Sequence, residues 1–178
     1  MLETGCVHVY TGNGKGKTTA AIGLTIRALG AGMSVYFGQF IKGMRYSEIG
    51  MLEALASSLE PGRLVLKQFG RGCFIMRDPE QADIDVALAG LAEASAALSS
   101  GSYDLVVLDE LNVAVNLGLI PQADVLALIA TRPPHVELVI TGRYASDAVK
   151  VAADLVTEMR EIKHYYKKGI EARTGIER

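Results

Sequence analysis

The sequence predicts an α/β fold, in which a mostly parallel sheet of about six strands is covered by helices on both faces. Three observations lead to this prediction. Short β-rich runs alternate along the chain with Ala/Leu-rich helical stretches, and 49% of the residues are apolar, as in ordinary globular proteins. The length of 178 residues favours one domain, residues 1–178.

Six short runs are expected to form the strands. Each is apolar or β-branched and is bounded by Gly, Pro or Ser signals. The strongest of them contains the run Leu105-Val106-Val107-Leu108. The six expected strands are residues 6–11, 34–40, 64–69, 104–109, 136–141 and 155–162.

Five helices are expected between these strands, at residues 17–29, 47–59, 79–98, 122–130 and 145–153. The third has small residues at nearly every turn, so it should pack closely on the sheet. Pro133 and Pro134 should end a helix before the strand that starts at Val136, because proline lacks the amide and disfavours helix in the residue before it.

Charge and composition argue against several classes of protein. The net charge is −2, whereas proteins that bind nucleic acid usually carry a basic patch. The basic run at residues 163–168 is interpreted as solvated surface. Cys6 and Cys73 are far apart and have no metal-ligand spacing. Because neither a leader segment nor an apolar run of about 18 residues is evident, we expect a cytoplasmic protein without a membrane partner.

A glycine-rich loop follows the first expected strand and leads into the first expected helix. Residues 11–19 read Thr-Gly-Asn-Gly-Lys-Gly-Lys-Thr-Thr. In a phosphate-binding loop, glycines let the backbone turn its N–H groups onto an anion, and the following helix adds its positive N-terminal dipole. Lys17 is expected to be an exposed loop lysine that reaches phosphate. The Thr18 hydroxyl can ligate Mg²⁺. The loop therefore predicts that Mg·ATP binds here.

The spacing of this loop departs from the usual G-x-x-x-x-G-K-[ST] pattern. Thr11 stands where the first glycine belongs, and the glycines have moved to Gly12 and Gly14. A merely tight turn is the structural alternative. Such a turn does not need three glycines and two lysines so close together, since glycine loses entropy on folding without adding packing. A phosphate site is therefore the preferred interpretation.

The apolar run from Tyr103 ends in two carboxylates, Asp109 and Glu110, and looks like a Walker B element. In open α/β sheets ligands bind outside the carboxyl ends of the strands, so Asp109 should lie beside the phosphate loop. A carboxylate in that place can hold Mg²⁺ directly or through water. The structural alternative is an acidic start to the next helix.

Two arginines are candidates for contacts with the triphosphate. Arg143 follows the strand expected at residues 136–141 and should lie at the same edge of the sheet, where its planar fork of donors suits phosphate oxygens. A surface ion pair is the equally weighted alternative. Arg27 lies ten residues beyond Lys17 in sequence, about 15 Å along the same helix, so a direct phosphate contact is not expected.

Taken together, five segments resemble the P-loop type of corrinoid adenosyltransferases. The resemblance covers nearly the whole chain, and the shifted glycine loop is similar to this family's own version of the motif. The five segments are the loop at 11–19, Gln-Phe-Ile-Lys-Gly at 39–43, the strand and carboxylates at 103–111, Thr-Gly-Arg at 141–143 and Glu-Ile-Lys-His at 161–164.

The resemblance implies a P-loop NTPase-like, RecA-like sheet and transfer of the 5′-deoxyadenosyl group of ATP to a Co(I) corrinoid, with release of triphosphate, in cobalamin biosynthesis or salvage. It implies ATP bound in a reversed sense, so that C5′ faces the cobalt. It gives catalytic roles to Lys17, Arg143 and Glu110, metal contacts to Thr18, Asp109 and Glu110, and substrate contacts to Gly12, Asn13, Gly14, Lys15, Gly16, Lys17, Thr18, Thr19, Arg143 and Phe74.

The corrinoid side of the site departs from the family pattern. Better-known members have aromatic residues just after a Gly-x-Gly, thought to displace the lower ligand of the corrinoid, but Cys73 and Ile75 hold these places here, with Phe74 between them. Either Phe74 acts from a shifted position, or Ile75 and Met76 form an apolar wall, or the preferred corrinoid lacks that ligand. Cys73 is interpreted as a small apolar residue rather than a cobalt ligand.

The resemblance also implies Mg²⁺ or Mn²⁺ as the metal, a homodimer, and a flavoprotein reductase that supplies Co(I). Reduced cobalt needs no general base, and the sequence offers no obvious Ser/His or Cys/His pair. Two alternatives stay open. In a nucleotide hydrolase or kinase, Glu110 would orient water or an acceptor at the γ-phosphate; a corrinoid or ATP sensor would bind without turnover.

Overall fold

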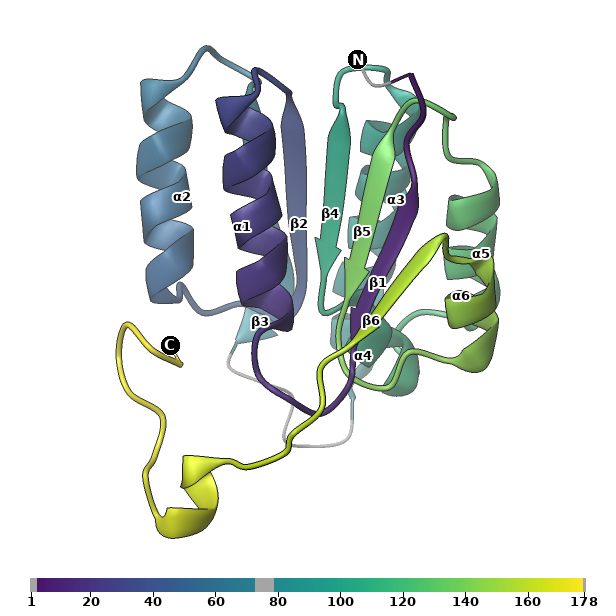
Figure 1. The fold of residues 1–178 in the computed structure, drawn as a ribbon. Helices are drawn as coiled ribbons and strands as arrows, with labels where there is room; N and C mark the ends of the chain where they lie inside the picture. Colours follow the sequence, from purple (N-terminus) through teal and green to yellow (C-terminus); the bar gives the residue numbers. More distant parts are fainter. Residues whose placement is uncertain (1–2, 73–78, 178) are drawn as a thin grey trace.

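A six-stranded sheet forms the centre of the computed structural model, which describes residues 3–72 and 79–177 (Figure 1). All neighbouring strands are parallel, in the order β3-β2-β4-β5-β1-β6. This arrangement confirms the α/β class and fits the P-loop NTPase-like fold expected from the sequence. The strands are β1 (Val7–Thr11), β2 (Val35–Lys42), β3 (Leu64–Gly72), β4 (Leu105–Asp109), β5 (Glu137–Thr141) and β6 (Leu155–Glu158).

The continuous apolar run of β4 is explained by burial on both faces of the sheet. Leu105 and Val107 belong to one core cluster, whereas Val106 and Leu108 belong to the other. Side chains alternate between the two faces of a strand, so a central strand between two layers of helices must be apolar at every position. Asp109, at the carboxyl end of this strand, is therefore carried into a buried position.

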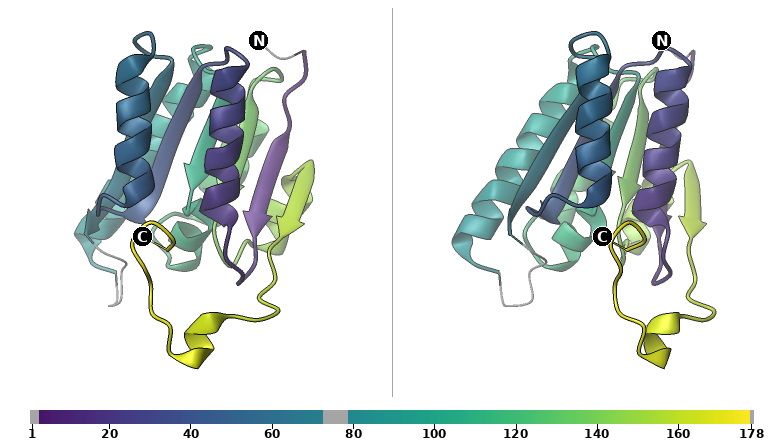
Figure 2. Two further views of the ribbon diagram at one scale, coloured as in Figure 1. Left: turned by 60° about the vertical axis from the view of Figure 1, so that its left-hand side comes forward. Right: turned by 90° about the vertical axis from the view of Figure 1, so that its left-hand side faces the viewer.

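Helices cover both faces of the sheet (Figures 1 and 2). The first two helices contribute residues to one core cluster, and the other four contribute to the second. On the first face lie α1 (Lys17–Gly30) and α2 (Ser47–Ser58); on the second lie α3 (Gln81–Ser99), α4 (Leu111–Asn116), α5 (Gln122–Ala130) and α6 (Asp147–Ala152).

Two expectations about the elements were wrong. The six-residue helix α4 was not expected, because it is too short to show helical periodicity and follows the strand ending at Asp109 almost directly. The last strand ends at Glu158 rather than at residue 162. Met159 leaves the sheet at that point, although its N–H still donates to the Thr11 carbonyl at 2.8 Å, and its own carbonyl accepts from the N–H of Gly14 at 2.7 Å.

The segment after β6 runs below the carboxyl ends of the strands and turns back toward the start of α1 (Figure 2). It contains one short 3₁₀ helix, η1 (Tyr165–Lys168). The functional side chains described below lie between this segment and the sheet. Among the described residues, no helix is both long and apolar enough to cross a membrane.

Candidate active site

The glycine-rich loop connects β1 to α1, as the sequence predicts. Gly16 caps α1 with a φ of 117°, a left-handed backbone that glycine adopts without strain. Gly12 is required for a second reason: a Cβ on this residue would lie 2.4 Å from the carbonyl oxygen of Met159. The glycines therefore allow the segment after β6 to pack against the loop, a contact that the sequence motif does not reveal.

Lys17 lies inside the loop and is only 8% exposed. Its Nζ donates to the carbonyl oxygens of Gly12 at 2.8 Å and of Gly14 at 2.7 Å. The expectation that this lysine is exposed was wrong, because the loop wraps around its ammonium group. Burial and the charge of Arg143 lower the pKa of Lys17, while Glu110 opposes this change.

Asp109 is fully buried and accepts hydrogen bonds on both carboxylate oxygens. Its Oδ1 receives the hydroxyls of Thr18 at 2.9 Å and Thr141 at 2.6 Å, and its Oδ2 receives the amide of Gln39 at 2.9 Å. These donors come from α1, β5 and β2. Since buried carboxylates need such partners, Asp109 joins the start of α1 to the centre of the sheet. Gln68 orients Gln39 in turn, at 2.9 Å.

Lys42 is a charged residue of the site that the sequence analysis did not single out. Its Nζ lies 3.4 Å from Glu110 Oε1 and 3.8 Å from Asp109 Oδ2, and its side chain is 11% exposed. Burial alone would lower the pKa of Lys42, but Asp109 and Glu110 outweigh burial and raise it. Burial and the neighbouring Asp109 raise the pKa of Glu110, while Lys42 opposes that change. The signal in the sequence was the segment at residues 39–43, which was noted only for its resemblance.

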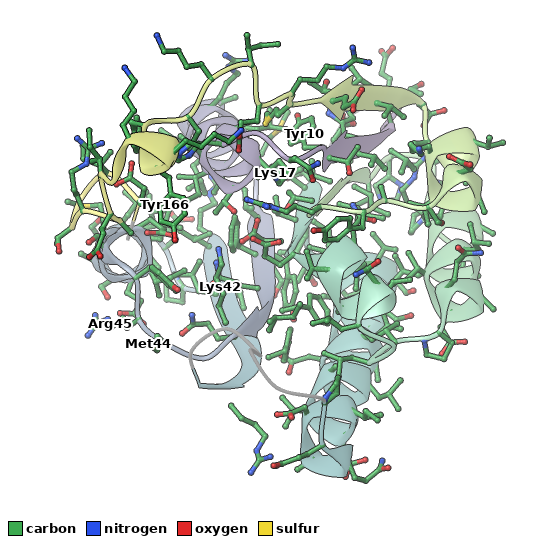
Figure 3. All side chains as sticks on the ribbon, turned by 90° about the horizontal axis from the view of Figure 1, so that it is seen from below. Tyr10, Lys17, Lys42, Met44, Arg45 and Tyr166 are labelled. Carbon is green, nitrogen blue, oxygen red and sulfur yellow. The ribbon has the colours of Figure 1, made fainter. Side chains whose placement is uncertain are left out.

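A cavity of about 860 Å³ opens at this edge of the sheet, within the range of small-molecule sites. In the view onto this edge, Lys17 and Lys42 come from different elements and face the same region (Figure 3). The glycine-rich loop, the ends of β2, β4 and β5, and the C-terminal segment all contribute to the lining. Its polar and charged lining includes Asn13, Lys15, Lys17, Thr18, Thr19, Lys42, Glu48, Glu110, Arg143, His164 and Glu177.

The cavity brings together most of the predicted site residues. Asp109 is not among the residues that line it and lies behind Thr18 instead. Arg27 is in the last turn of α1 and is not among the residues that line the cavity. Phe74 and its neighbours, including the three alternatives for the lower ligand, lie outside the described residues.

His164 was also missed as a lining residue. The sequence analysis placed it within a basic run interpreted as solvated surface, and the neighbouring Lys167 is indeed exposed and paired with Glu161 at 2.6 Å. His164 itself lines the cavity, and its Nδ1 accepts from the N–H of Tyr166 to start η1. The motif at residues 161–164 was the available signal.

The donor set at the cavity suits a hard cation bound together with phosphate. The described residues contain no group of three or more His, Cys, Asp or Glu side chains that could hold a metal ion by themselves. Thr18 and Glu110, which both carry side-chain oxygens, line the cavity, and the Thr18 hydroxyl donates a hydrogen bond to Asp109. Mg²⁺ prefers oxygen ligands, keeps several waters and commonly uses only one or two carboxylates plus substrate phosphates, so these residues fit it.

The fold is that of an α/β protein with an all-parallel sheet, consistent with the P-loop NTPase-like class, and Asp109 at the end of β4 accepts a hydrogen bond from the first threonine of α1. The chain belongs to the ATP:corrinoid adenosyltransferase family BtuR/CobO/CobP, whose family model matches residues 3–178.

Relatives with similar sequences extend over the same range. A corrinoid adenosyltransferase of Pseudomonas aeruginosa is 40% identical over 175 residues, which is 98% of this chain and 84% of the relative. The corrinoid adenosyltransferase CobA of Salmonella typhimurium is 35% identical, and a corrinoid adenosyltransferase of Escherichia coli is 34% identical; each alignment covers 98% of this chain and 86% of the relative. The resemblance found in the sequence motifs is thus confirmed.

Proposed function

We propose that this protein transfers the 5′-deoxyadenosyl group of ATP to the Co(I) centre of a corrinoid and releases triphosphate, in the biosynthesis or salvage of cobalamin. The observation that carries the proposal is the family match over residues 3–178. The geometry supports it, since one cavity is lined by the phosphate loop, by Glu110 and by Arg143. The same match favours adenosyl transfer over phosphoryl transfer at the γ-phosphate.

In this reaction cobalt supplies both electrons of the new bond. Co(I) attacks C5′ of ATP, a Co–C bond forms, and the bond between C5′ and its phosphate oxygen breaks. The electron pair of the broken bond stays with the departing triphosphate, and cobalt is formally oxidised to Co(III). No proton has to be removed from the nucleophile, so no general base is needed.

The task of the protein is to hold the triphosphate and to balance its charge. Lys17 supplies a partly desolvated ammonium, and Arg143 supplies a guanidinium that lines the same cavity. By analogy with other preorganised donors, one such contact is worth about 3 kcal/mol of transition-state stabilisation. Holding C5′ against cobalt would provide much of the remaining rate enhancement.

Mg²⁺, or Mn²⁺ in its place, would be held by Thr18 and Glu110, with Asp109 acting through the Thr18 hydroxyl or a water. When bound, the metal neutralises charge that develops on the leaving triphosphate. What the chain itself contributes is the orientation of these oxygens. The hydrogen bond from Thr18 to Asp109, at 2.9 Å, fixes the hydroxyl at the start of α1.

The remaining parts of the proposal rest on the family resemblance. We expect a homodimer in the cytoplasm, a flavoprotein reductase that supplies Co(I), and a corrinoid surface that includes Phe74. Sedimentation of the purified chain would test the dimer. Phe74→Ala should slow transfer to complete cobalamin more than transfer to a corrinoid that lacks the lower ligand, and equal effects would remove Phe74 from that role.

The decisive experiment is to mix the protein anaerobically with Mg·ATP and a chemically reduced corrinoid. We expect the cobalt spectrum to change to that of an alkylated corrinoid, with intact triphosphate released in equal amount. ADP with phosphate as products would instead identify a hydrolase or kinase. Binding of both substrates without any product would identify a sensor.

A further inference from the structure

The ammonium group of Lys42 lies between two carboxylates but is bonded tightly to neither. Its distances to Glu110 and Asp109, 3.4 and 3.8 Å, exceed the 2.7–2.9 Å typical of a charge-assisted hydrogen bond. Its third neighbour is the ring of Tyr46, whose centroid is 5.3 Å away. Lys42 also lines the cavity that contains Lys17. The contacts therefore hold the charge of Lys42 in place while leaving it free to take a better acceptor.

The backbone before Lys42 is strained in a way that aims this side chain. Ile41 has a φ of 68°, which is a genuine outlier for a β-branched residue. The pairing of β2 with β3 shifts register between Phe40 and Lys42. Gly70 permits the close backbone approach at this shift, since a Cβ on Gly70 would lie 2.4 Å from the carbonyl oxygen of Ile41. Bulges of this kind re-aim a side chain and are common beside active sites.

A positive φ at a non-glycine residue also occurs near the ends of two other strands beside the cavity, β4 and β5. Within residues 3–72 and 79–177, the non-glycine residues with positive φ are Ile41, Glu110 and Tyr144. They lie near the carboxyl ends of three adjacent strands: Ile41 is the last residue but one of β2, Glu110 follows β4 directly, and Tyr144 comes shortly after β5. Each is, or directly adjoins, a residue that lines the cavity. Strained residues persist where the surrounding structure fixes them, and they cluster at functional sites. One of the three is Glu110 itself, Tyr144 follows Arg143 directly, and Ile41 precedes Lys42 directly.

We propose that Lys42 is a further cationic contact of the polyphosphate, and that it exchanges Asp109 and Glu110 for phosphate oxygens when Mg·ATP binds. The inference rests on the proposed function in placing a triphosphate in this cavity. Without nucleotide, Lys42 balances the charge of the two carboxylates. With nucleotide, Glu110 would face Mg²⁺ and Asp109 would act on it through Thr18, so the charge of Lys42 becomes available to the departing triphosphate.

Two affinities should move in opposite directions when this charge is removed. We expect Lys42→Met to weaken binding of inorganic triphosphate in the presence of Mg²⁺ by about tenfold or more, because one charged contact is lost. The same substitution should strengthen binding of Mg²⁺ alone several-fold, because the carboxylate pair loses its competing cation. Lys42→Arg, which keeps the charge, should retain most of the triphosphate affinity. Titration calorimetry measures the triphosphate affinity of both variants and the Mg²⁺ affinity of Lys42→Met.

Lys67→Met is the matched control, since Lys67 lies on the neighbouring strand and pairs with Glu93 at 2.8 Å, away from the cavity. If Lys42→Met does not fold, Lys42→Gln replaces it. Triphosphate affinity equal to that of the control would overturn the proposal, as would a loss of Mg²⁺ affinity. These titrations use no corrinoid, so opposite shifts would support the role of Lys42 even if the wild-type protein failed to form an adenosylated corrinoid.

Discussion

Two lysines of the glycine-rich loop, Lys17 and Lys15, hold this loop in two very different environments. Lys17 points inward, where its ammonium is bonded to the carbonyls of Gly12 and Gly14 and where burial and Arg143 lower its pKa. Lys15, two residues earlier, points outward to the C-terminal segment. Its Nζ lies 2.7 Å from the carbonyl of Ile176 and 2.9 Å from Glu177, and hydrogen bonding to Glu177 raises its pKa.

The two lysines differ more in their exposure to water than in the distances to their partners. The distances in the two regions are similar, but the contacts around Lys17 and Asp109 are shielded from water, whereas the side chain of Lys15 is 41% exposed. Exposed ion pairs contribute little because water and salt screen them, while a buried charge that loses its partner is strongly destabilising. Substitutions in the inner region should therefore matter far more than substitutions in the outer one.

The largest effect is expected from Lys17→Ala. Its removal should reduce adenosyl transfer by about 100-fold or more, because a partly desolvated cation at the triphosphate is lost. The fold should survive, since the carbonyls of Gly12 and Gly14 can bind water instead. The initial rate with reduced corrinoid and circular dichroism would measure the two outcomes. A near-wild-type rate would count decisively against the assigned site, with Lys67→Ala as the control.

Thr141→Val should come next. The Thr141 hydroxyl donates to Asp109 at 2.6 Å and accepts from the N–H of Glu110 at 3.0 Å, so valine leaves two buried groups with one partner fewer. We expect a loss of about 1–3 kcal/mol in the free energy of unfolding, together with slower turnover. Thr25→Val is the control, because Thr25 is equally buried but bonds only to Ala21 within α1. Equal losses in both variants would remove the special role of the inner network.

A smaller effect, dependent on pH, is expected from Glu110→Gln in the protein without nucleotide. Burial and Asp109 raise the pKa of Glu110 above its ordinary 4.5. Between 4.5 and the raised value the folded protein keeps a proton that the unfolded chain has lost, so wild-type stability falls as pH rises through this window. The glutamine variant should not share this fall.

Urea unfolding from about pH 4 to about pH 8 would test this difference. The stability of Glu110→Gln relative to wild type should rise as the pH rises through the window. Loss of the contact with Lys42 makes the variant less stable by an amount that opposes this gain. Glu93→Gln, which removes an exposed carboxylate paired with Lys67, is the control. A pH-independent difference between Glu110→Gln and the wild type would contradict the assigned environment.

The smallest effect is expected from Glu177→Gln in the outer region. Arg173 and Tyr165 lower the pKa of Glu177, so its charge persists in acid below pH 4.5, but the contact with Lys15 is screened. The KM for ATP should stay within about twofold of wild type. Steady-state kinetics at low and high salt would measure the KM for ATP of the variant and of the wild type. A large rise in KM would show that the C-terminal segment closes the site.

The sequence could predict most of the fold because its signals are local. Alternating apolar and helical stretches gave six strands and five of the helices, and residues 11–19 with Asp109 and Glu110 indicated the site. The short helix α4 was not predicted, because six residues are too few to show helical periodicity. The end of β6 was placed too far along the chain, since Met159 continues the apolar pattern but bonds to the phosphate loop instead.

Tertiary structure alone decided which side chains surround that site. Lys42 becomes a neighbour of Asp109 through a register shift between β2 and β3, and Lys15 meets Glu177 across 162 residues of chain. Such contacts depend on backbones that approach closely in space, which a motif of nine residues cannot encode. Local pattern specifies which strands and loops form, whereas the packing of distant segments determines how their charges are shared.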